Sequence, residues 1–78
     1  MPKLELYVRP GCPYCQKVIR FMGENKINVP LKDINNEQNF QTLIKFGGKQ
    51  QVPCLFVDNK AMYESDEIIK WCKQNYLN

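Results

Sequence analysis

Residues 3–15 read KLELYVRPGCPYC, and this stretch decides the fold. Apolar and polar residues alternate from Lys3 to Val8, which predicts a β-strand. Arg9-Pro10-Gly11 interrupts the alternation. Pro13 then suits the first position of a helix, where its missing N–H costs nothing. The stretch therefore predicts a strand, a short break and a helix that opens on two cysteines.

The rest of the chain predicts further elements, bounded by turn residues. They are a strand at 29–34, a helix capped by Asn35-Asn36, strands at 53–57 and 61–63 around the turn 58–60, and a last helix capped by Ser65. The second helix is expected to bury Phe40, Leu43 and Ile44 and to end at Gly47-Gly48. A strand–helix–strand unit implies a parallel pair, and a hairpin adds antiparallel strands. The predicted fold is α/β, βαβαββα, with a four-stranded mixed sheet flanked by helices on both faces, in one domain over 1–78.

The composition excludes several classes of protein. The 78 residues include four cysteines and no histidine, and the net charge is +3. Without histidine, a Ser-His-Asp triad, a Cys–His dyad and a histidine-ligated zinc site are all impossible. The basic residues are spread along the chain, which argues against a nucleic-acid partner. No apolar run approaches the roughly 20 residues of a membrane span, and no signal peptide is visible, so we expect a cytoplasmic protein without membrane contact.

Cys12 and Cys15 lie at the predicted junction between strand and helix, and that position matters for their chemistry. Unpaired N–H groups and the positive end of the helix dipole stabilise a thiolate there. Sites of this kind lower a cysteine pKa from about 8.5 to roughly 3.5–7.5. Arg9 and Lys17 add positive charge nearby. Cys12 is therefore the expected nucleophile, and Cys15, one turn further into the helix, is the expected resolving thiol.

A structural or metal-binding pair is the alternative for this dithiol. A tetrahedral zinc site would need a second pair of ligands, but Cys54 and Cys72 stand apart from each other in the sequence. A C-x-x-C that opens a helix after a strand favours a redox function. We therefore expect no metal, and we expect Cys54 and Cys72 to be small buried apolar side chains.

Three motifs, in order along the chain, resemble those of a glutaredoxin. They are Cys12-Pro13-Tyr14-Cys15, Val52-Pro53 before an apolar strand, and Glu64-Ser65-Asp66 at a helix start. The resemblance implies the thioredoxin fold, a cis Val52–Pro53 bond, and glutathione as co-substrate. It also implies reduction of protein disulfides and of glutathione mixed disulfides, as in electron transport and cell redox homeostasis. Many glutaredoxins have two glycines where this chain has Tyr63-Glu64, and its Glu-Ser pair is more similar to the N-terminal domains of glutathione transferases.

The resemblance further implies a glutathione site. Its expected residues are Arg9, Tyr14, Gln51, Val52, Pro53, Glu64, Ser65 and Asp66. The Val52 backbone would pair with the cysteinyl unit like a short added strand. The amides of Ser65 and Asp66, at a helix N-terminus, would hold the γ-glutamyl carboxylate. Asp66 or Glu64 would meet the ammonium group. Simple capping of the helix by Ser65 is the alternative reading of this segment.

The remaining contacts concern the other end of glutathione and the thiols. Arg9, with Gln51 and Lys49, would face the glycyl carboxylate. Ordinary exposed side chains without a ligand are the alternative for all three. Tyr14 would cover the thiols and form one wall of the groove, because the start of this helix should face solvent.

Two other functions share the same sequence pattern. Some glutaredoxins hold a [2Fe–2S] cluster between two subunits through the first cysteine and glutathione. Cys12 could be such a ligand. Pro13 and Tyr14, however, are more typical of the oxidoreductase branch. Other small glutaredoxin-like proteins take electrons from thioredoxin reductase and donate them to ribonucleotide reductase. The complete glutathione motif favours a monomeric enzyme that uses glutathione to reduce disulfide-containing or glutathionylated proteins.

Overall fold

The computed structural model describes residues 3–77, with the predicted elements in the predicted order. They are β1 (Leu4–Val8), α1 (Pro13–Glu24), β2 (Leu31–Asp33), α2 (Glu37–Thr42), β3 (Cys54–Val57), β4 (Lys60–Met62) and α3 (Ser65–Tyr76). A π-helical turn, Leu43–Gly47, directly follows α2. The order βαβαββα is confirmed.

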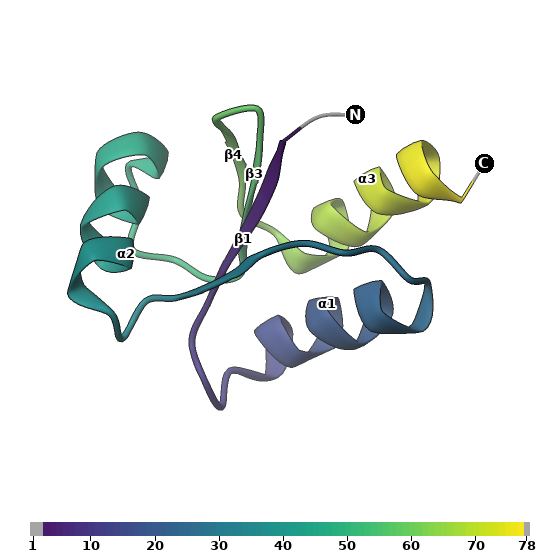
Figure 1. The fold of residues 1–78 in the computed structure, drawn as a ribbon, viewed down its shortest axis with the longest axis horizontal. Helices are drawn as coiled ribbons and strands as arrows, with labels where there is room; N and C mark the ends of the chain where they lie inside the picture. The colour runs from purple at the N-terminus through teal and green to yellow at the C-terminus, as the bar shows by residue number, and fades with distance from the viewer. Residues whose placement is uncertain (1–2, 78) are drawn as a thin grey trace.

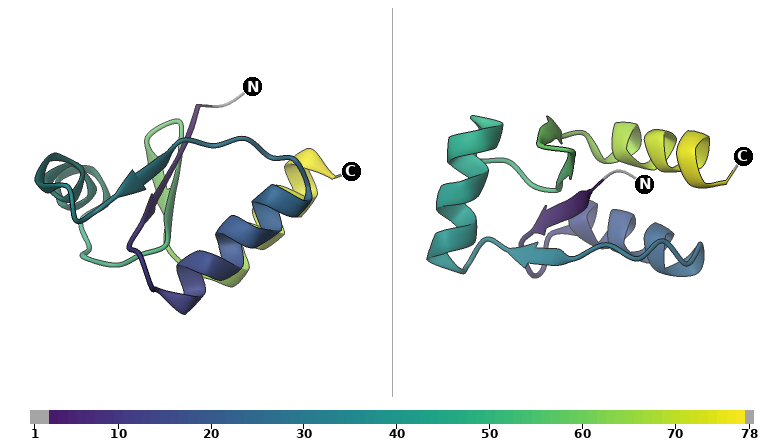
Figure 2. Two further views of the ribbon diagram at one scale, coloured as in Figure 1. Left: turned by 60° about the horizontal axis from the view of Figure 1, so that its bottom comes forward. Right: turned by 45° about the horizontal axis from the view of Figure 1, so that its top comes forward.

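The four strands form one mixed sheet in the order β2-β1-β3-β4. β1 runs parallel to β2, with Leu6 opposite Leu31, and antiparallel to β3, with Leu6 opposite Leu55. β4 returns antiparallel along β3, with Met62 opposite Leu55. Figures 1 and 2 show α2 on one side of this sheet and α1 and α3 next to each other on the other side. The predicted mixed sheet with helices on both faces is confirmed.

The strands divide the core between the two faces, because successive side chains of a strand point to opposite sides. On one face, Leu6 and Leu55 pack with Val18 of α1 and Ile68 of α3. The other face carries a smaller cluster made of Tyr7, Leu43, Cys54 and Phe56. The dithiol belongs to the larger cluster, so the sulfurs lie on the side of the sheet that α1 and α3 cover.

All four strands differ from their predicted bounds, and β1 and β3 do so only by starting one residue later. β2 covers only Leu31–Asp33, because Pro30 has no N–H for the ladder and takes part only through its carbonyl oxygen. β4 begins at Lys60, one residue before the predicted strand. Asp58 and Asn59 make the hairpin turn, with φ values of 49° and 72°. Positive φ at both central residues matches the right-handed twist of the strands that such a turn joins.

The segment around α2 confirms its predicted ends but not all of its predicted buried face. Asn36 caps the helix by accepting the N–H of Asn39 at 3.1 Å, and Gly48 ends the segment in a left-handed conformation with φ 83°. Leu43 is fully buried, whereas Phe40 is only half-buried and Ile44 is 36 % exposed. The π-helical turn explains the exposure of Ile44, because its wider spiral departs from the 3.6-residue period on which the prediction relied.

Candidate active site

The two thiols lie where β1 gives way to α1. Gly11 turns the chain there with a φ of 82°, a conformation that glycine adopts at no steric cost. Cys12 follows at the N-cap position, and Pro13 is the first helical residue. The Cys12 Sγ accepts the N–H of Cys15 at 3.4 Å. The sulfur thus takes the place of the side-chain oxygen that commonly caps a helix.

The two thiols differ in burial and in acidity. Cys12 is 9 % exposed, and Cys15 is fully buried. Burial is the largest single influence on Cys12 and opposes its ionisation. Hydrogen bonds from the Cys15 thiol and from the N–H groups of Cys15 and Tyr14, with the charge of Arg9, outweigh burial and lower the pKa of Cys12. Burial raises the pKa of Cys15 to about 11, and the neighbouring Cys12 sulfur adds to the increase. The geometry therefore favours a thiolate at Cys12 and keeps the proton on Cys15.

The charge of Lys17 was expected next to Cys12, but its side chain pairs with an acidic residue of α3. Its Nζ lies 2.6 Å from Oδ1 of Asp66, so the two residues join α1 to the start of α3. Arg9, and not Lys17, is the basic residue that lowers the pKa of Cys12. Lys17, which the sequence offered as a second contributor besides Arg9, instead pairs with the Asp66 carboxylate on α3.

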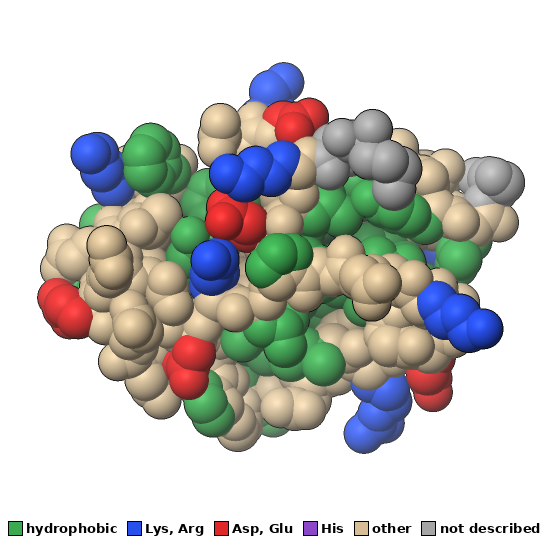
Figure 3. Space-filling model, in the orientation of Figure 1, with side chains coloured by type: hydrophobic (Ala, Val, Ile, Leu, Met, Phe, Trp, Pro, Cys, Tyr) green, Lys and Arg blue, Asp and Glu red, His purple; other side chains and the backbone are tan. Residues whose placement is uncertain are grey.

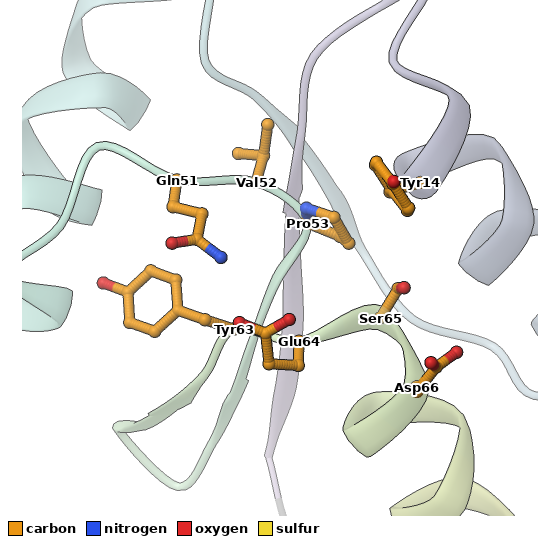
Figure 4. A pocket seen from close by; sticks show the side chains of 8 residues that line it. All are labelled: Tyr14, Gln51, Val52, Pro53, Tyr63, Glu64, Ser65 and Asp66. Atoms are coloured by element: carbon orange, nitrogen blue, oxygen red, sulfur yellow. The ribbon is translucent and has the colours of Figure 1, made fainter.

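A pocket of about 340 Å³ reaches Tyr14, the residue next to Cys15 in the sequence, and neither Cys12 nor Cys15 is part of its lining. It is lined by Tyr14, Gln51, Val52, Pro53, Tyr63, Glu64, Ser65 and Asp66. Figure 4 shows Gln51 and Tyr63 at one end and Tyr14, Ser65 and Asp66 towards the other. The segment before β3, the segment before α3 and the start of α1 thus meet around a single cavity. Every predicted glutathione-binding residue except one contributes to its lining.

The exception is Arg9, which is exposed and lies outside the lining. Lys49 also lies outside it, with its Nζ 5.4 Å from the centroid of the Tyr63 ring. Tyr63 also lines the pocket, although the sequence pattern predicted only a strand at this residue. A signal was present in the sequence, because Tyr63 directly precedes the Glu64-Ser65 pair that was expected to bind a ligand.

The start of α3 corrects a second prediction. Glu64 is the N-cap residue, and its carbonyl oxygen accepts the N–H of Ile68 at 2.9 Å. Ser65 is therefore the first helical residue and does not cap the helix; its side chain is only 9 % exposed. The first amides of a helix have no partner within it, so those of Ser65 and Asp66 are available as donors to an anion.

The segment before β3 and the two remaining cysteines agree with expectation. The Val52–Pro53 bond is cis, as the resemblance implied. Cys54 and Cys72 are fully buried, and burial raises the pKa of both thiols, that of Cys54 to about 11. These two cysteines are therefore unreactive in comparison with Cys12.

Within residues 3–77, no group of three or more cysteine or acidic side chains is arranged to hold a metal ion. In the same described part of the chain, no helix has both the length and the apolar character to cross a membrane. Figure 3 shows basic and acidic side chains interspersed on the face that it presents.

Comparison with known proteins places this geometry in a family. The chain is similar to Glutaredoxin 1 of Rickettsia felis, with 30 % identity over 76 residues that cover 94 % of the chain and 74 % of that protein. The chain belongs to the glutaredoxin family. A family model described as glutathione S-transferase, N-terminal domain, also matches residues 6–78 of this glutaredoxin, so the chain belongs to that family of domains as well.

Solved structures agree with the fold of this glutaredoxin. The chain resembles glutathione transferase Omega 3C from Trametes versicolor with a TM-score of 0.86 and 28 % identity, over 97 % of the chain but only 34 % of that transferase. It matches a thioredoxin-like protein with a TM-score of 0.81 and 23 % identity, over 95 % of the chain and 94 % of that protein. The fold is thus the predicted thioredoxin fold, and the relatives support a thiol–disulfide oxidoreductase.

Proposed function

We propose that this glutaredoxin is a glutathione-dependent oxidoreductase that acts through Cys12 and Cys15. One observation carries the proposal. A thiol of lowered pKa caps α1, and Tyr14 of the same helix lines a pocket together with Val52 and with Ser65 and Asp66 at the start of α3. Such a pocket suits a short cysteine-containing peptide with a free carboxylate, and glutathione is a peptide of this kind.

The pocket offers a group for each part of glutathione. The cysteinyl backbone pairs with the Val52 backbone. The γ-glutamyl carboxylate accepts from the amides of Ser65 and Asp66. The ammonium group meets the Asp66 carboxylate, which Lys17 already holds at 2.6 Å, so binding exchanges one cation for another. Tyr14 is 65 % exposed and covers the ligand near the thiols.

The two ends of the pocket divide the remaining contacts. Gln51 lies at the end away from Ser65, where its amide suits the glycyl carboxylate. Arg9 and Lys49 lie outside the lining and add positive charge from the rim. Pro53 forms wall surface, and Glu64 offers a second carboxylate near the ammonium group.

A glutathionylated protein needs only the first thiol. The Cys12 thiolate attacks the glutathione sulfur, a Cys12–glutathione disulfide forms, and the protein leaves as a thiolate that takes a proton from water. A second glutathione thiolate then attacks the glutathione sulfur of this intermediate, which releases oxidised glutathione and the Cys12 thiolate. The lowered pKa of Cys12 helps both steps, because it provides the attacking thiolate first and a good leaving group afterwards.

A protein disulfide also needs Cys15. Cys12 attacks one sulfur of the substrate and forms a mixed disulfide. Cys15 then attacks the Cys12 sulfur, which releases the reduced protein and leaves a Cys12–Cys15 disulfide for two glutathione molecules to reduce. After burial, the neighbouring Cys12 sulfur contributes to the high pKa of Cys15. Once Cys12 is bonded to the substrate, its negative charge is gone and Cys15 ionises more readily.

Variants of the cysteines test these roles. Cys12→Ser should abolish both reactions. Cys15→Ser should retain the deglutathionylation of a glutathionylated peptide and lose the reduction of a protein disulfide. Cys72→Ala, at a fully buried cysteine outside the pocket lining, is the matched control and should retain both activities. Activity in Cys12→Ser would refute the assignment.

A second assay identifies the source of electrons. The wild-type protein is supplied either with glutathione and glutathione reductase or with thioredoxin reductase. Turnover with glutathione supports the proposal. Turnover with thioredoxin reductase only would instead support an electron donor of the kind that serves ribonucleotide reductase, and a coloured dimer after anaerobic purification would support a cluster-binding protein.

A further inference from the structure

The Tyr63 hydroxyl contacts the start of the segment that forms one wall of the pocket. It accepts the N–H of Lys49 at 3.2 Å and lies 3.4 Å from the carbonyl oxygen of the same residue. The Tyr63 ring packs against the smaller core cluster, to which Cys54 belongs. Lys49 precedes the pocket residues 51–53, and Cys54 follows them. The hydroxyl group therefore fastens the start of the segment 49–54, while the ring packs against the cluster that contains its end.

We propose that Tyr63 is a positioning residue: by fixing the segment 49–54, it holds the Val52 backbone in place to bind glutathione. This inference rests on the proposed function and names a determinant of its substrate affinity. Figure 4 shows the Tyr63 ring flanking Gln51, with the hydroxyl directed away from Ser65 and Asp66. The hydroxyl thus acts on the segment rather than on the ligand.

Gly47 provides the space that this hydroxyl occupies. A Cβ atom at Gly47 would collide with the Tyr63 hydroxyl oxygen and would lie 3.2 Å from Cζ of the same ring. The backbone of Gly47 lies outside the left-handed region, so the glycine is needed for space and not for its conformation. Gly47 is also the last residue of the π-helical turn, a local geometry that is frequent at functional sites.

The ring of Tyr63 is held independently of its hydroxyl. It packs against the smaller core cluster that contains Cys54 and Phe56, and the Lys49 ammonium lies above its face. A phenylalanine at position 63 should therefore keep the ring in place and lose only the hydrogen bonds. This separation makes Tyr63→Phe a clean test of the hydroxyl.

Tyr63→Phe should raise the KM for glutathione by about three- to tenfold, the loss expected for one or two net hydrogen bonds. The kcat and the pH profile of Cys12 alkylation should not change, because the hydroxyl does not contact the thiols. The backbone amides of the segment 49–54 should exchange with deuterium faster than in the wild type. Tyr76→Phe makes the same chemical change near the end of α3 and is the control for all three measurements.

Gly47→Ala tests the same positioning role by disturbing the Tyr63 hydroxyl from the neighbouring backbone. The added methyl group should displace the hydroxyl and raise the KM in the same way. Gly23→Ala is its control, because a Cβ at Gly23 meets nothing within 4 Å. Combining Gly47→Ala with Tyr63→Phe should raise the KM by less than the product of the single effects, since the collision partner is then partly removed.

The outcomes separate this inference from the proposed function. An unchanged KM in Tyr63→Phe, or a change in kcat or in the Cys12 alkylation profile, would overturn the positioning role while the glutathione activity stands. If the wild type shows no turnover with glutathione, the proposed function fails. Deuterium exchange then tests the positioning role of Tyr63 alone. Faster exchange of residues 49–54 in Tyr63→Phe supports this role, and unchanged exchange overturns it.

Discussion

The thiol of Cys54 should make the free energy of unfolding depend on pH. Replacing this cysteine with alanine should remove that part of the dependence. Cys54 is fully buried, and burial raises its pKa from 9.0 to about 11. Each pKa unit corresponds to about 1.36 kcal/mol, so ionisation of this thiol costs the folded state about 3 kcal/mol. Because the folded pKa lies above the unfolded one, this stabilisation is complete below about pH 9 and is lost as the pH rises towards about 11.

Cys54→Ala should therefore change the order of stability between neutral and alkaline pH. At neutral pH the variant should be about 1 kcal/mol less stable, because it removes one buried sulfur of roughly methylene size. By about pH 10 the wild type should have lost about 1 kcal/mol that the alanine variant cannot lose. The free energies of unfolding of the two proteins should thus cross near pH 10.

Urea unfolding measures this crossing directly. It is followed by Trp71 fluorescence at a series of pH values, with a phosphine reductant to keep the cysteines reduced. Val18→Ala, at a fully buried position that cannot ionise, is the control and should cost about 2 kcal/mol at every pH. A constant difference between wild type and Cys54→Ala from neutral to alkaline pH would refute the reasoning, since the thiol would then not be held in its neutral form.

Other features lead to further expected results. Iodoacetamide should alkylate Cys12 before Cys15 at neutral pH, because only Cys12 has a lowered pKa; peptide mass spectrometry decides this, and earlier labelling of Cys15 would reverse the assigned roles. Asn36→Ala should lower the free energy of unfolding by about 1 kcal/mol through loss of the cap on Asn39, whereas Asn36→Asp should not, and urea unfolding of both variants tests the cap. Leu43→Ala should cost about 2–5 kcal/mol in the same measurement, and a much smaller loss would show that the π-helical turn collapses onto the cavity.

Local patterns in the sequence predicted what depends on neighbouring residues. The alternation before Arg9 and the proline after Cys12 placed the dithiol at the junction of a strand and a helix, and β1 and α1 lie there. Asn36 and Gly48 marked the two ends of the second helical segment for local reasons, a side-chain cap and a left-handed backbone. The order of the elements and the mixed sheet followed from these signals.

Contacts between distant residues account for what the sequence could not predict. Lys17 and Asp66 are 49 residues apart, and only the packing of α1 against α3 brings their charges together. The close approach of Gly47 to Tyr63 likewise depends on the π-helical turn, for which the 3.6-residue period gave no signal. The start of α3 is a local exception: Ser65 was expected to cap the helix, but the carbonyl of the preceding residue, Glu64, makes the first helical hydrogen bond instead.

The topology of the sheet explains why three remote segments form one pocket. β1 ends next to the start of β3, because the two strands are antiparallel and Tyr7 lies opposite Cys54. β4 runs antiparallel to β3, so β4 ends next to the start of β3. α3 begins at this same end of the sheet. Three groups therefore lie together at one end of the sheet. They are the thiols that follow β1, the Val52 backbone that precedes β3 and the first amides of α3. In a chain without histidine, this convergence provides backbone N–H groups at two helix starts, and these groups can stabilise the charge of a thiolate and of a bound carboxylate.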